Sequence, residues 1–353
     1  MIIVRNFDYS LLKNKCWDSE ILLLVAQIHE YKGKQALYLK QKPAVLERLI
    51  EVAKVQSTQA SNEIEGIVTT DTRLKKLCAE KTTPKNREEW EIMGYREVLN
   101  IIHESYEYIP IQSNYILQLH QYMYKYSETG VGGSFKNTQN YISKTDNEGN
   151  KCVLFTPLAP YETPDAIESI CNSYNRMQDL QEIDPLILIP VFIHDFLCIH
   201  PFNDGNGRMS RLLTTLLLYR SGYVVGKYVS LESKIAKNKN LYYDVLEECQ
   251  NGWHEGNEDS APFIKYLLRT ILAAYRDFEE RVQLLEEKLP AVELVRRAAC
   301  KKIGKFTKSD IMELCPSIGK SSVENALKEL VESGKLIRHG DGRSTYYTRN
   351  DII

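Results

Sequence analysis

The chain has 353 residues, of which 43% are hydrophobic and 26% are charged, with a formal net charge of -2. This length predicts a large core divided into two or three units, and the composition excludes an intrinsically disordered chain. A charge so close to zero gives no reason to expect the whole molecule to bind nucleic acid or an anionic membrane.

The N-terminal residues, the apolar runs and the cysteines indicate where in the cell the protein is expected. The first residues lack the basic and then apolar layout of a signal peptide, and no apolar run reaches membrane-spanning length. The eight cysteines are scattered without the spacing of a metal site. We therefore expect a cytoplasmic protein with reduced thiols and no membrane partner.

Helical periodicity dominates the first third of the chain. Apolar residues at helical spacing predict one helix beginning after a cap at Asp18 and a second from about Pro43 to Glu65, which Gly66 would end. After a polar, lysine-rich stretch, helical patterns return at residues 90–102 and 113–126.

Residues 128–164 differ in kind, because glycine, asparagine and proline are concentrated there. They predict loops with one short hairpin, in which Tyr141, Ile142 and Ser143 face residues 153–155. Helical patterns then resume at residues 165–180, 185–199, 208–219, 242–251 and 261–289.

The last 64 residues change character again. Helices ending near 302 and covering 307–314 and 321–333 are followed by β-rich pieces at 335–338 and 344–347. Three helices and a hairpin in this order are typical of a winged helix-turn-helix. Residues 290–353 hold 12 Lys and Arg against 8 Asp and Glu, but the third helix is itself acidic. DNA binding and target docking or dimerisation therefore both stay open as roles of this tail.

The most informative segment is a glycine-rich loop that follows His200. An apolar helix runs into His200, Pro201 stops it, and Gly205 and Gly207 let the backbone turn before a new helix begins near Arg208. Such a loop directs unpaired amides and the positive end of a helix dipole to one place, which favours a phosphate.

Charged residues gather at the same place. Arg208 and Arg211 project from one side of the new helix. Together with the amides of the loop, they predict a site that binds a polyphosphate. Asp204 is an oxygen ligand suited to Mg²⁺ arriving with the phosphates, and His200 is the natural proton acceptor. Each feature alone would indicate only a turn or a solvated helix face; their coincidence within twelve residues indicates a functional site.

This segment resembles the signature of the Fic family, H-P-F-x-[DE]-G-N-G-R-x-x-R. The nine matching positions are His200, Pro201, Phe202, Asp204, Gly205, Asn206, Gly207, Arg208 and Arg211. The resemblance implies a mainly α fold: a Fic-type helical core with a short β-hairpin flap, plus a C-terminal winged helix-turn-helix. It also implies a protein adenylyltransferase, which uses Mg²⁺ and transfers AMP from ATP to a Ser, Thr or Tyr hydroxyl of a target protein with release of pyrophosphate.

The resemblance also implies roles for the loop residues. His200 would deprotonate the acceptor hydroxyl, Asp204 would hold Mg²⁺ and Phe202 would anchor the loop. Gly207 favours AMP transfer, because relatives that act as kinases tend to replace this glycine. The nucleotide-binding residues would be Asn203, Gly205, Asn206, Gly207, Arg208 and Arg211.

The same resemblance places a substrate-aligning flap in the stretch that ends at residues 155–160. Residues 133–136 resemble a G-x-[FY]-R motif that relatives often carry, with Lys136 in place of the arginine.

A second motif lies upstream, at residues 61–66. Glu65 sits in the last turn of its helix, where the negative dipole end disfavours a carboxylate, so a cation is expected to face it. Ser61 shares its face and Gly66 caps the helix. The hexapeptide resembles the Fic inhibitory motif [ST]-x-x-x-E-[GN], which implies that Glu65 pairs with Arg211 and prevents productive ATP binding. Glu63 points to another face and is the second choice.

We accordingly divide the chain into four parts: an N-terminal helical region with the inhibitory motif (1–110), a Fic catalytic core (111–265), a connecting helix (266–289) and a winged helix-turn-helix (290–353). ATP and a target protein are the expected partners, while self-modification, a homodimer and DNA stay open. Two alternatives also stay open: a nucleotide-sensing, DNA-binding transcriptional regulator, and an enzyme that removes AMP with Glu65 orienting a water.

Overall fold

The computed structural model is mainly helical, and it describes residues 5–350 apart from 42, 80, 128–129, 131, 146–150, 287–288 and 316–317. The α-helices are α1 (Ser19–Gln41), α2 (Pro43–Ile64), α3 (Asp71–Cys78), α4 (Arg87–Ser105), α5 (Ser113–Met123), α6 (Thr163–Leu180), α7 (Pro185–Ile199), α8 (Asn206–Arg220), α9 (Leu231–Lys237), α10 (Lys239–Gln250), α11 (Ala261–Glu286), α12 (Ala291–Cys300), α13 (Lys308–Leu314) and α14 (Lys320–Glu332). The 3-10 helices are η1 (Tyr9–Asn14), η2 (Tyr106–Tyr108), η3 (Val224–Lys227) and η4 (Gly342–Ser344). The strands are β1 (Ile142–Thr145), β2 (Lys151–Phe155), β3 (Leu336–His339) and β4 (Tyr346–Arg349).

Helix α7 lies in the middle of the helical body. Apart from His194 and Asp195 its side chains are apolar, and every residue from Leu186 to Ile199 is buried, as expected for a helix covered on all sides. Asp184 caps its first turn by accepting a hydrogen bond from Leu186 N at 2.8 Å. Helices α6, α8 and α11 pack against it, so the loop that follows His200 emerges from the best-buried element of the body.

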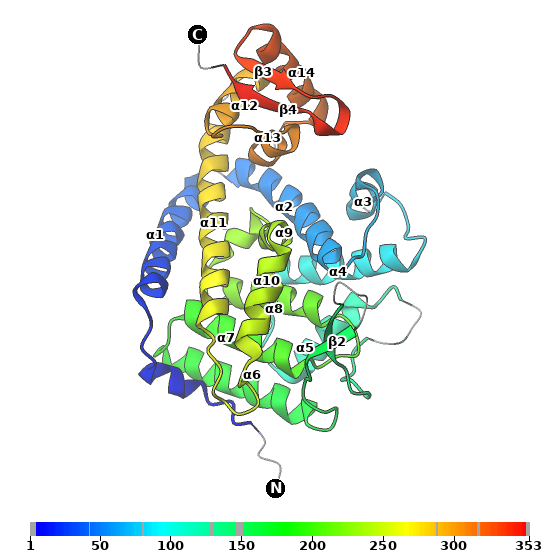
Figure 1. Cartoon of the computed structure of the whole chain (residues 1–353), viewed down its shortest axis with the longest axis vertical. Coiled ribbons are helices and arrows are strands. Elements are labelled where there is room, and N and C mark those ends of the chain that lie inside the picture. The colour runs from blue at the N-terminus through cyan, green and yellow to red at the C-terminus, as the bar shows by residue number, and fades with distance from the viewer. Residues whose placement is uncertain are drawn as a thin grey trace.

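Two hydrophobic cores are present among the described residues. The larger joins buried residues from Phe7 to Val282, and the smaller joins residues from Val295 to Leu336. Figure 1 shows the long helix α11 running out of the body toward the second core, with α1 beside it. The expected boundaries at 110, 265 and 289 stay predictions.

The tail follows the order that its sequence predicts. Helices α12, α13 and α14 precede an antiparallel hairpin in which Leu336 faces Arg349 and His339 faces Tyr346. The tail contacts the body through an ion pair of 2.6 Å between Lys237 Nζ and Glu313. Three helices and a hairpin fit a winged helix, while the second predicted strand begins at Tyr346, because the turn η4 occupies residues 342–344.

The hairpin predicted in the middle of the chain is confirmed. Strands β1 and β2 are antiparallel, with Ile142 opposite Phe155 and Ser143 opposite Val153. The predicted loop residues Asn147, Gly149 and Asn150 lie outside the described residues.

Two short helices had no counterpart in the predictions. Helices α3 and α9 span eight and seven residues, too few for a clear 3.6-residue period. The residues that cap them could have been recognised in the sequence, because threonine and serine are preferred at the N-cap. Thr70 and Ser230 accept hydrogen bonds from the amides of Arg73 and Ser233. The helix predicted over 113–126 ends earlier, at Met123.

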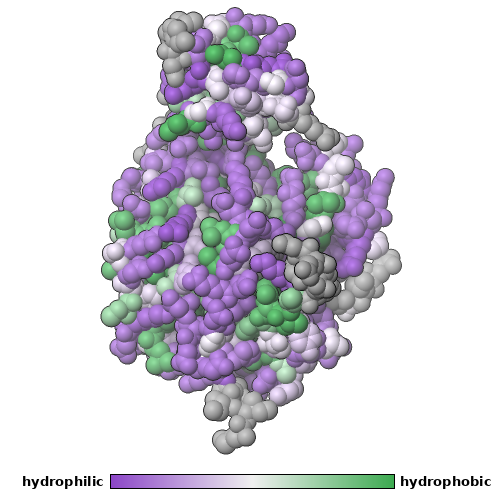
Figure 2. Space-filling model, in the orientation of Figure 1, coloured by the Kyte–Doolittle hydropathy of each residue, from purple (hydrophilic) through white to green (hydrophobic). Residues whose placement is uncertain are grey.

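No described helix combines the length and the apolar character that crossing a bilayer requires. On the face in Figure 2, hydrophilic residues dominate and apolar ones form separate small groups.

A buried carboxylate ties the N-terminal segment to α7, which leads to a stability prediction. Asp195 accepts hydrogen bonds from Trp253 Nε1 at 2.7 Å and from Tyr9 Oη at 2.9 Å. We expect Tyr9→Phe to lower the free energy of unfolding by about 1–3 kcal/mol, because it removes a donor from a buried charge. Urea denaturation followed by tryptophan fluorescence measures the effect. Tyr275→Phe is the matched control, since the buried hydroxyl of Tyr275 has no partner among the described residues; equal losses in the two variants would contradict the prediction.

Candidate active site

The loop between α7 and α8 is turned and anchored by its own residues. His200 ends α7 in a left-handed conformation, with φ of 53° and ψ of 62°, and Gly205 precedes α8 with φ of 85°. The ring of Phe202 is buried and stacks on His120, with centroids 3.7 Å apart. His120 also donates from Nε2 to Asp204 O at 3.1 Å, so this histidine of α5 supports the loop from outside it.

A cavity of about 950 Å³ opens where the loop meets α2, α4, α10 and the hairpin of β1 and β2, the expected flap. The predicted site residues that line it are Glu65, Gly66, His200, Asn203, Asp204, Gly205, Asn206, Gly207, Arg208 and Arg211. The structure therefore brings the two sequence motifs, which lie more than 130 residues apart, to one cavity.

The imidazole of His200 has a defined tautomer. Its Nδ1 lies 3.2 Å from Leu197 O, and since a carbonyl only accepts, Nδ1 must carry the proton and donate. Nε2 is then the nitrogen with a free lone pair. Burial, helped by the positive charge of Lys136, lowers the pKa of His200 to about 4, although the hydrogen bond to Leu197 O opposes this. The ring is therefore neutral, as a proton acceptor must be.

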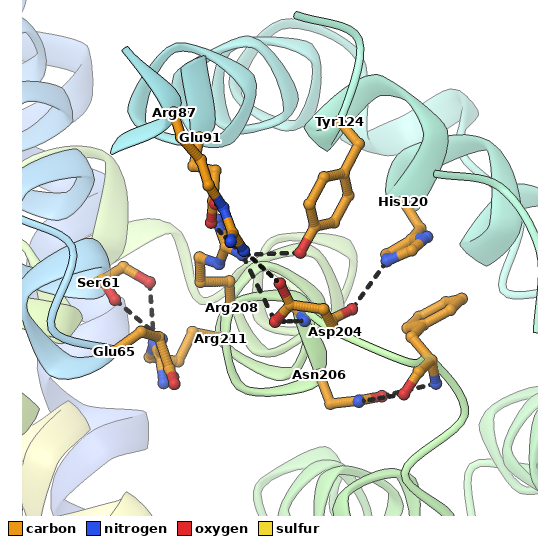
Figure 3. Close-up of polar contacts among 12 residues, drawn as sticks. Ser61, Glu65, Arg87, Glu91, His120, Tyr124, Asp204, Asn206, Arg208 and Arg211 are labelled. Carbon is orange, nitrogen blue, oxygen red and sulfur yellow. Dashed lines mark hydrogen bonds and ion pairs between the residues drawn. The ribbon is translucent and has the colours of Figure 1, made fainter. Parts of the chain in front are cut away.

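Arg211 is buried and is held by the helix that carries the upstream motif. Its Nε donates to Ser61 Oγ at 2.8 Å, and its Nη2 donates to Ser61 O at 2.9 Å and to Glu65 Oε1 at 2.8 Å (Figure 3). Burial opposes the charge, but Glu65 outweighs it and raises the pKa of Arg211 above its usual value. Its Nη1 is buried with no partner in the described part of the chain, which leaves one spare donor beside the loop.

Glu65 reaches the loop because α2 ends just before it. Gly66, with φ of 80°, donates to Glu63 O at 3.0 Å, and Ile67 N donates to Asn62 O at 2.9 Å, which is a Schellman cap. Lys239 of α10 adds a bond from Nζ to Ile64 O at 2.5 Å. Glu63 instead accepts from Gln59 Nε2 at 2.8 Å, away from the loop.

The carboxylate of Glu65 lies against Gly207 in the first turn of α8. A Cβ added at residue 207 would be 2.3 Å from Glu65 Oε1 and 3.3 Å from Arg211 Nη1. The absence of a side chain at 207 is therefore what permits this close approach. The anionic group occupies the N-terminus of a helix, which is where an anion is most stable.

Sequence reasoning missed the partners of the other arginine. Arg208 donates from Nη2 to Glu91 at 2.8 Å and to Tyr124 Oη at 2.8 Å, and both Glu91 and Arg208 are buried (Figure 3). Arg87 bridges Glu91, at 2.7 Å, and Asp204, at 3.5 Å. These contacts join α4 to the loop across more than 100 residues, and no local pattern in α4 signals them.

Asp204 fits the part of a ligand for a cation that comes with its substrate. Its side chain is 49% exposed at the cavity, and one oxygen accepts from Gly205 N at 2.7 Å. No group of three or more His, Cys, Asp or Glu within the described ranges could hold a metal by itself. A single accessible carboxylate is enough for Mg²⁺, because this ion usually keeps several waters and takes its other ligands from the phosphates of the substrate.

The two asparagines of the loop have different surroundings. Asn206 accepts from Phe202 N at 2.9 Å and donates to Phe202 O at 2.7 Å, so its side chain shapes the loop. Its backbone amide lies at the start of α8. Asn203 is exposed, and it donates to Asn137 and accepts from Thr138 at 3.1 and 3.3 Å.

Parts of this chain are similar to known proteins. Residues 110–218 match the model of the Fic/DOC family. The Nematostella vectensis protein named Protein adenylyltransferase Fic is 26% identical over 238 residues, which are 64% of this chain and 48% of that protein. Protein adenylyltransferase fic-1 of Caenorhabditis elegans is 29% identical over 186 residues, 52% of this chain and 32% of that protein. The chain thus spans about a third to a half of the length of these curated relatives.

Solved structures share the fold. The crystal structure of a Fic family protein from Desulfovibrio desulfuricans G20 aligns with a TM-score of 0.62 and 21% identity, covering 96% of this chain and 98% of that one. Residues 134–508 of Fic-1 from C. elegans align with a TM-score of 0.58 and 21% identity, covering 78% and 74%.

The contact between Gly207 and Glu65 leads to a prediction on coupling. We expect Gly207→Ala to lower the free energy of unfolding by about 1–3 kcal/mol, because the added methyl group would clash with the Glu65 carboxylate. In a Glu65→Ala background, Gly207→Ala should lower the free energy of unfolding by less, because the carboxylate is gone. A double-mutant cycle by thermal unfolding measures this coupling; costs that add to within about 0.5 kcal/mol would contradict it.

Proposed function

We propose that this chain, whose residues 110–218 match the Fic/DOC family, is a protein adenylyltransferase that moves AMP from ATP to a Ser, Thr or Tyr hydroxyl of a target protein. One observation carries the proposal: a neutral imidazole with a free Nε2 and the N-terminus of α8 line the same cavity. This arrangement supplies a base and a phosphate cradle side by side.

The geometry supports a displacement at the α-phosphorus. The phosphates would lie at the amides of the first turn of α8, with the spare Nη1 of Arg211 and the unpartnered Nε and Nη1 of Arg208 as further donors. His200 Nε2 would take the proton of the acceptor hydroxyl, whose oxygen forms a bond to the α-phosphorus as the bond to pyrophosphate breaks. Asp204 would hold Mg²⁺, whose charge offsets that of the phosphates. The protein contributes mainly placement and charge stabilisation.

We also propose that Glu65 restrains this reaction. Its carboxylate engages Arg211 and lies against Gly207, so it would share the end of α8 with the phosphates of ATP. Two anions at one helix terminus repel each other, which disfavours the productive position of the nucleotide. The Schellman cap and Lys239 support this placement of the carboxylate.

Replacing Glu65 tests the activity and the restraint together. With ATP labelled at the α-phosphate, we expect Glu65→Gly to raise covalent self-labelling by more than roughly tenfold, since loss of a charge-assisted pair is worth a few kcal/mol. Label at the γ-phosphate should not be retained. The double variant with His200→Ala should lose the label.

Glu63→Gly is the matched control, because it makes the same change two residues away on the exposed face. If Glu65→Gly and Glu63→Gly label equally, the proposal that Glu65 restrains the reaction is wrong. Loss of AMP removal in Glu65→Gly, without gain of transfer, would favour the reverse reaction. Nucleotide binding without any covalent label would favour a nucleotide-sensing regulator.

The pKa of His200 predicts the pH dependence of the reaction. Burial lowers this pKa from 6.5 to about 4, so the base stays neutral as the pH falls through the range where a free histidine would gain a proton. We expect kcat/KM of the Glu65→Gly protein to show no acid limb near 6.5 and to decline only toward a pH of about 4. Steady-state labelling in buffers of constant ionic strength measures the profile; an acid limb centred near 6.5 would contradict it.

A further inference from the structure

Segment 136–140, between α5 and the flap, contacts the backbone of the His200 loop. Lys136 and Asn140 together donate to the carbonyl oxygens of four consecutive residues, 199 to 202. The distances are 2.9 Å from Lys136 Nζ to Ile199 O, 3.3 Å from Asn140 Nδ2 to His200 O, 2.8 Å from Lys136 N to Pro201 O and 3.0 Å from Asn140 Nδ2 to Phe202 O.

The two side chains also hold each other. Lys136 Nζ donates to Asn140 Oδ1 at 3.1 Å, and Lys136 is only 3% exposed. Burial lowers the pKa of Lys136 to about 8, although Glu162 opposes this. The buried ammonium is stabilised by its position at the C-terminus of α7. The last carbonyls of that helix lack partners within it and form its negative end.

The backbone that these bonds hold is strained. His200 is not a glycine, yet it adopts a left-handed conformation, and the residue before a proline is itself restricted. Such conformations are unfavourable and persist only where the surroundings hold them. The direction of the imidazole depends on this backbone, since Nδ1 bonds to Leu197 O within the same turn.

We propose that Lys136 and Asn140 are positioning residues, which hold His200 in its left-handed conformation and so aim Nε2 into the cavity. The proposal rests on the proposed AMP transfer. It also connects the base to the flap, because Asn140 lies two residues before β1 and the neighbouring Gln139 donates to Pro157 O at 3.0 Å, just after β2.

Isosteric variants in the Glu65→Gly background test the proposal. Asn140→Asp keeps the shape and an acceptor for Lys136, but it can no longer donate to the carbonyls of His200 and Phe202. Asn175→Asp is the matched control, because Asn175 donates to a backbone carbonyl, Ile111 O, at 2.8 Å in another part of the fold. Lys136→Met removes the ammonium and Lys136→Arg keeps a charged donor. Lys265→Met is the control, because it removes an ammonium from a partly exposed ion pair with Asp18.

We expect kcat to fall by about 10- to 100-fold in Asn140→Asp and in Lys136→Met, because small misplacements of a reacting group have costs of this order. KM for ATP should stay within about twofold, since the phosphate donors belong to α8. Lys136→Arg should retain more activity than Lys136→Met, and the two controls should match their parent. Thermal unfolding verifies that each variant is folded.

A second measurement does not depend on activity. In protein labelled with nitrogen-15 histidine, His200 should show the shifts of an imidazole protonated at Nδ1, with its signals identified by their loss in His200→Gln. Asn140→Asp should move them toward the tautomer mixture of a free imidazole, and Asn175→Asp should not. Unchanged His200 signals in Asn140→Asp, or a loss of kcat no larger than in Asn175→Asp, would overturn the proposal. If Glu65→Gly shows no labelling, the proposed function fails, while the spectra still decide the positioning role.

Discussion

The structure of this site depends on one sharp turn, in which the buried helix α7 ends at a left-handed His200 and α8 begins six residues later. An apolar helix that is covered on all sides cannot shift easily, so it fixes the point at which the chain leaves the core. The turn then presents an imidazole and the amide end of a second helix to the same cavity. Hydrogen bonds to four successive carbonyls, from a segment 60 or more residues away, hold that turn.

Around this turn, each buried guanidinium has a carboxylate from a different helix. Arg211 meets Glu65 at the end of α2, and Arg208 meets Glu91 of α4. A buried charge without a partner is costly, so these pairs stabilise the arginines before any ligand arrives. A phosphate that displaced one carboxylate would exchange one charged partner for another, which makes such a site well suited to restraint by its own chain.

The two carboxylates differ in the freedom they retain. Glu91 is 5% exposed and also pairs with Arg87, so it is part of the wall of the cavity. Glu65 is 32% exposed and follows the last residue of α2, where the chain turns away. A movement of the end of α2 would free Arg211 while Arg208 kept its partners, which agrees with the proposal that Glu65 is the restraint.

Some of this could be predicted from the sequence because the signals are local. The caps at Asp18 and Gly66, the extent of α7, the antiparallel hairpin of β1 and β2 and the tight turn at Gly205 all follow from periodicity and backbone preferences within a few residues. The pairing of Glu65 with Arg211 was expected only through the resemblance to a family motif. The contacts of Arg208 with Glu91, of Asp204 with Arg87 and of Lys136 with Ile199 O were not expected. They join segments more than 60 residues apart, and which distant side chains meet is decided by the packing of helices around α7, for which no local pattern carries a signal.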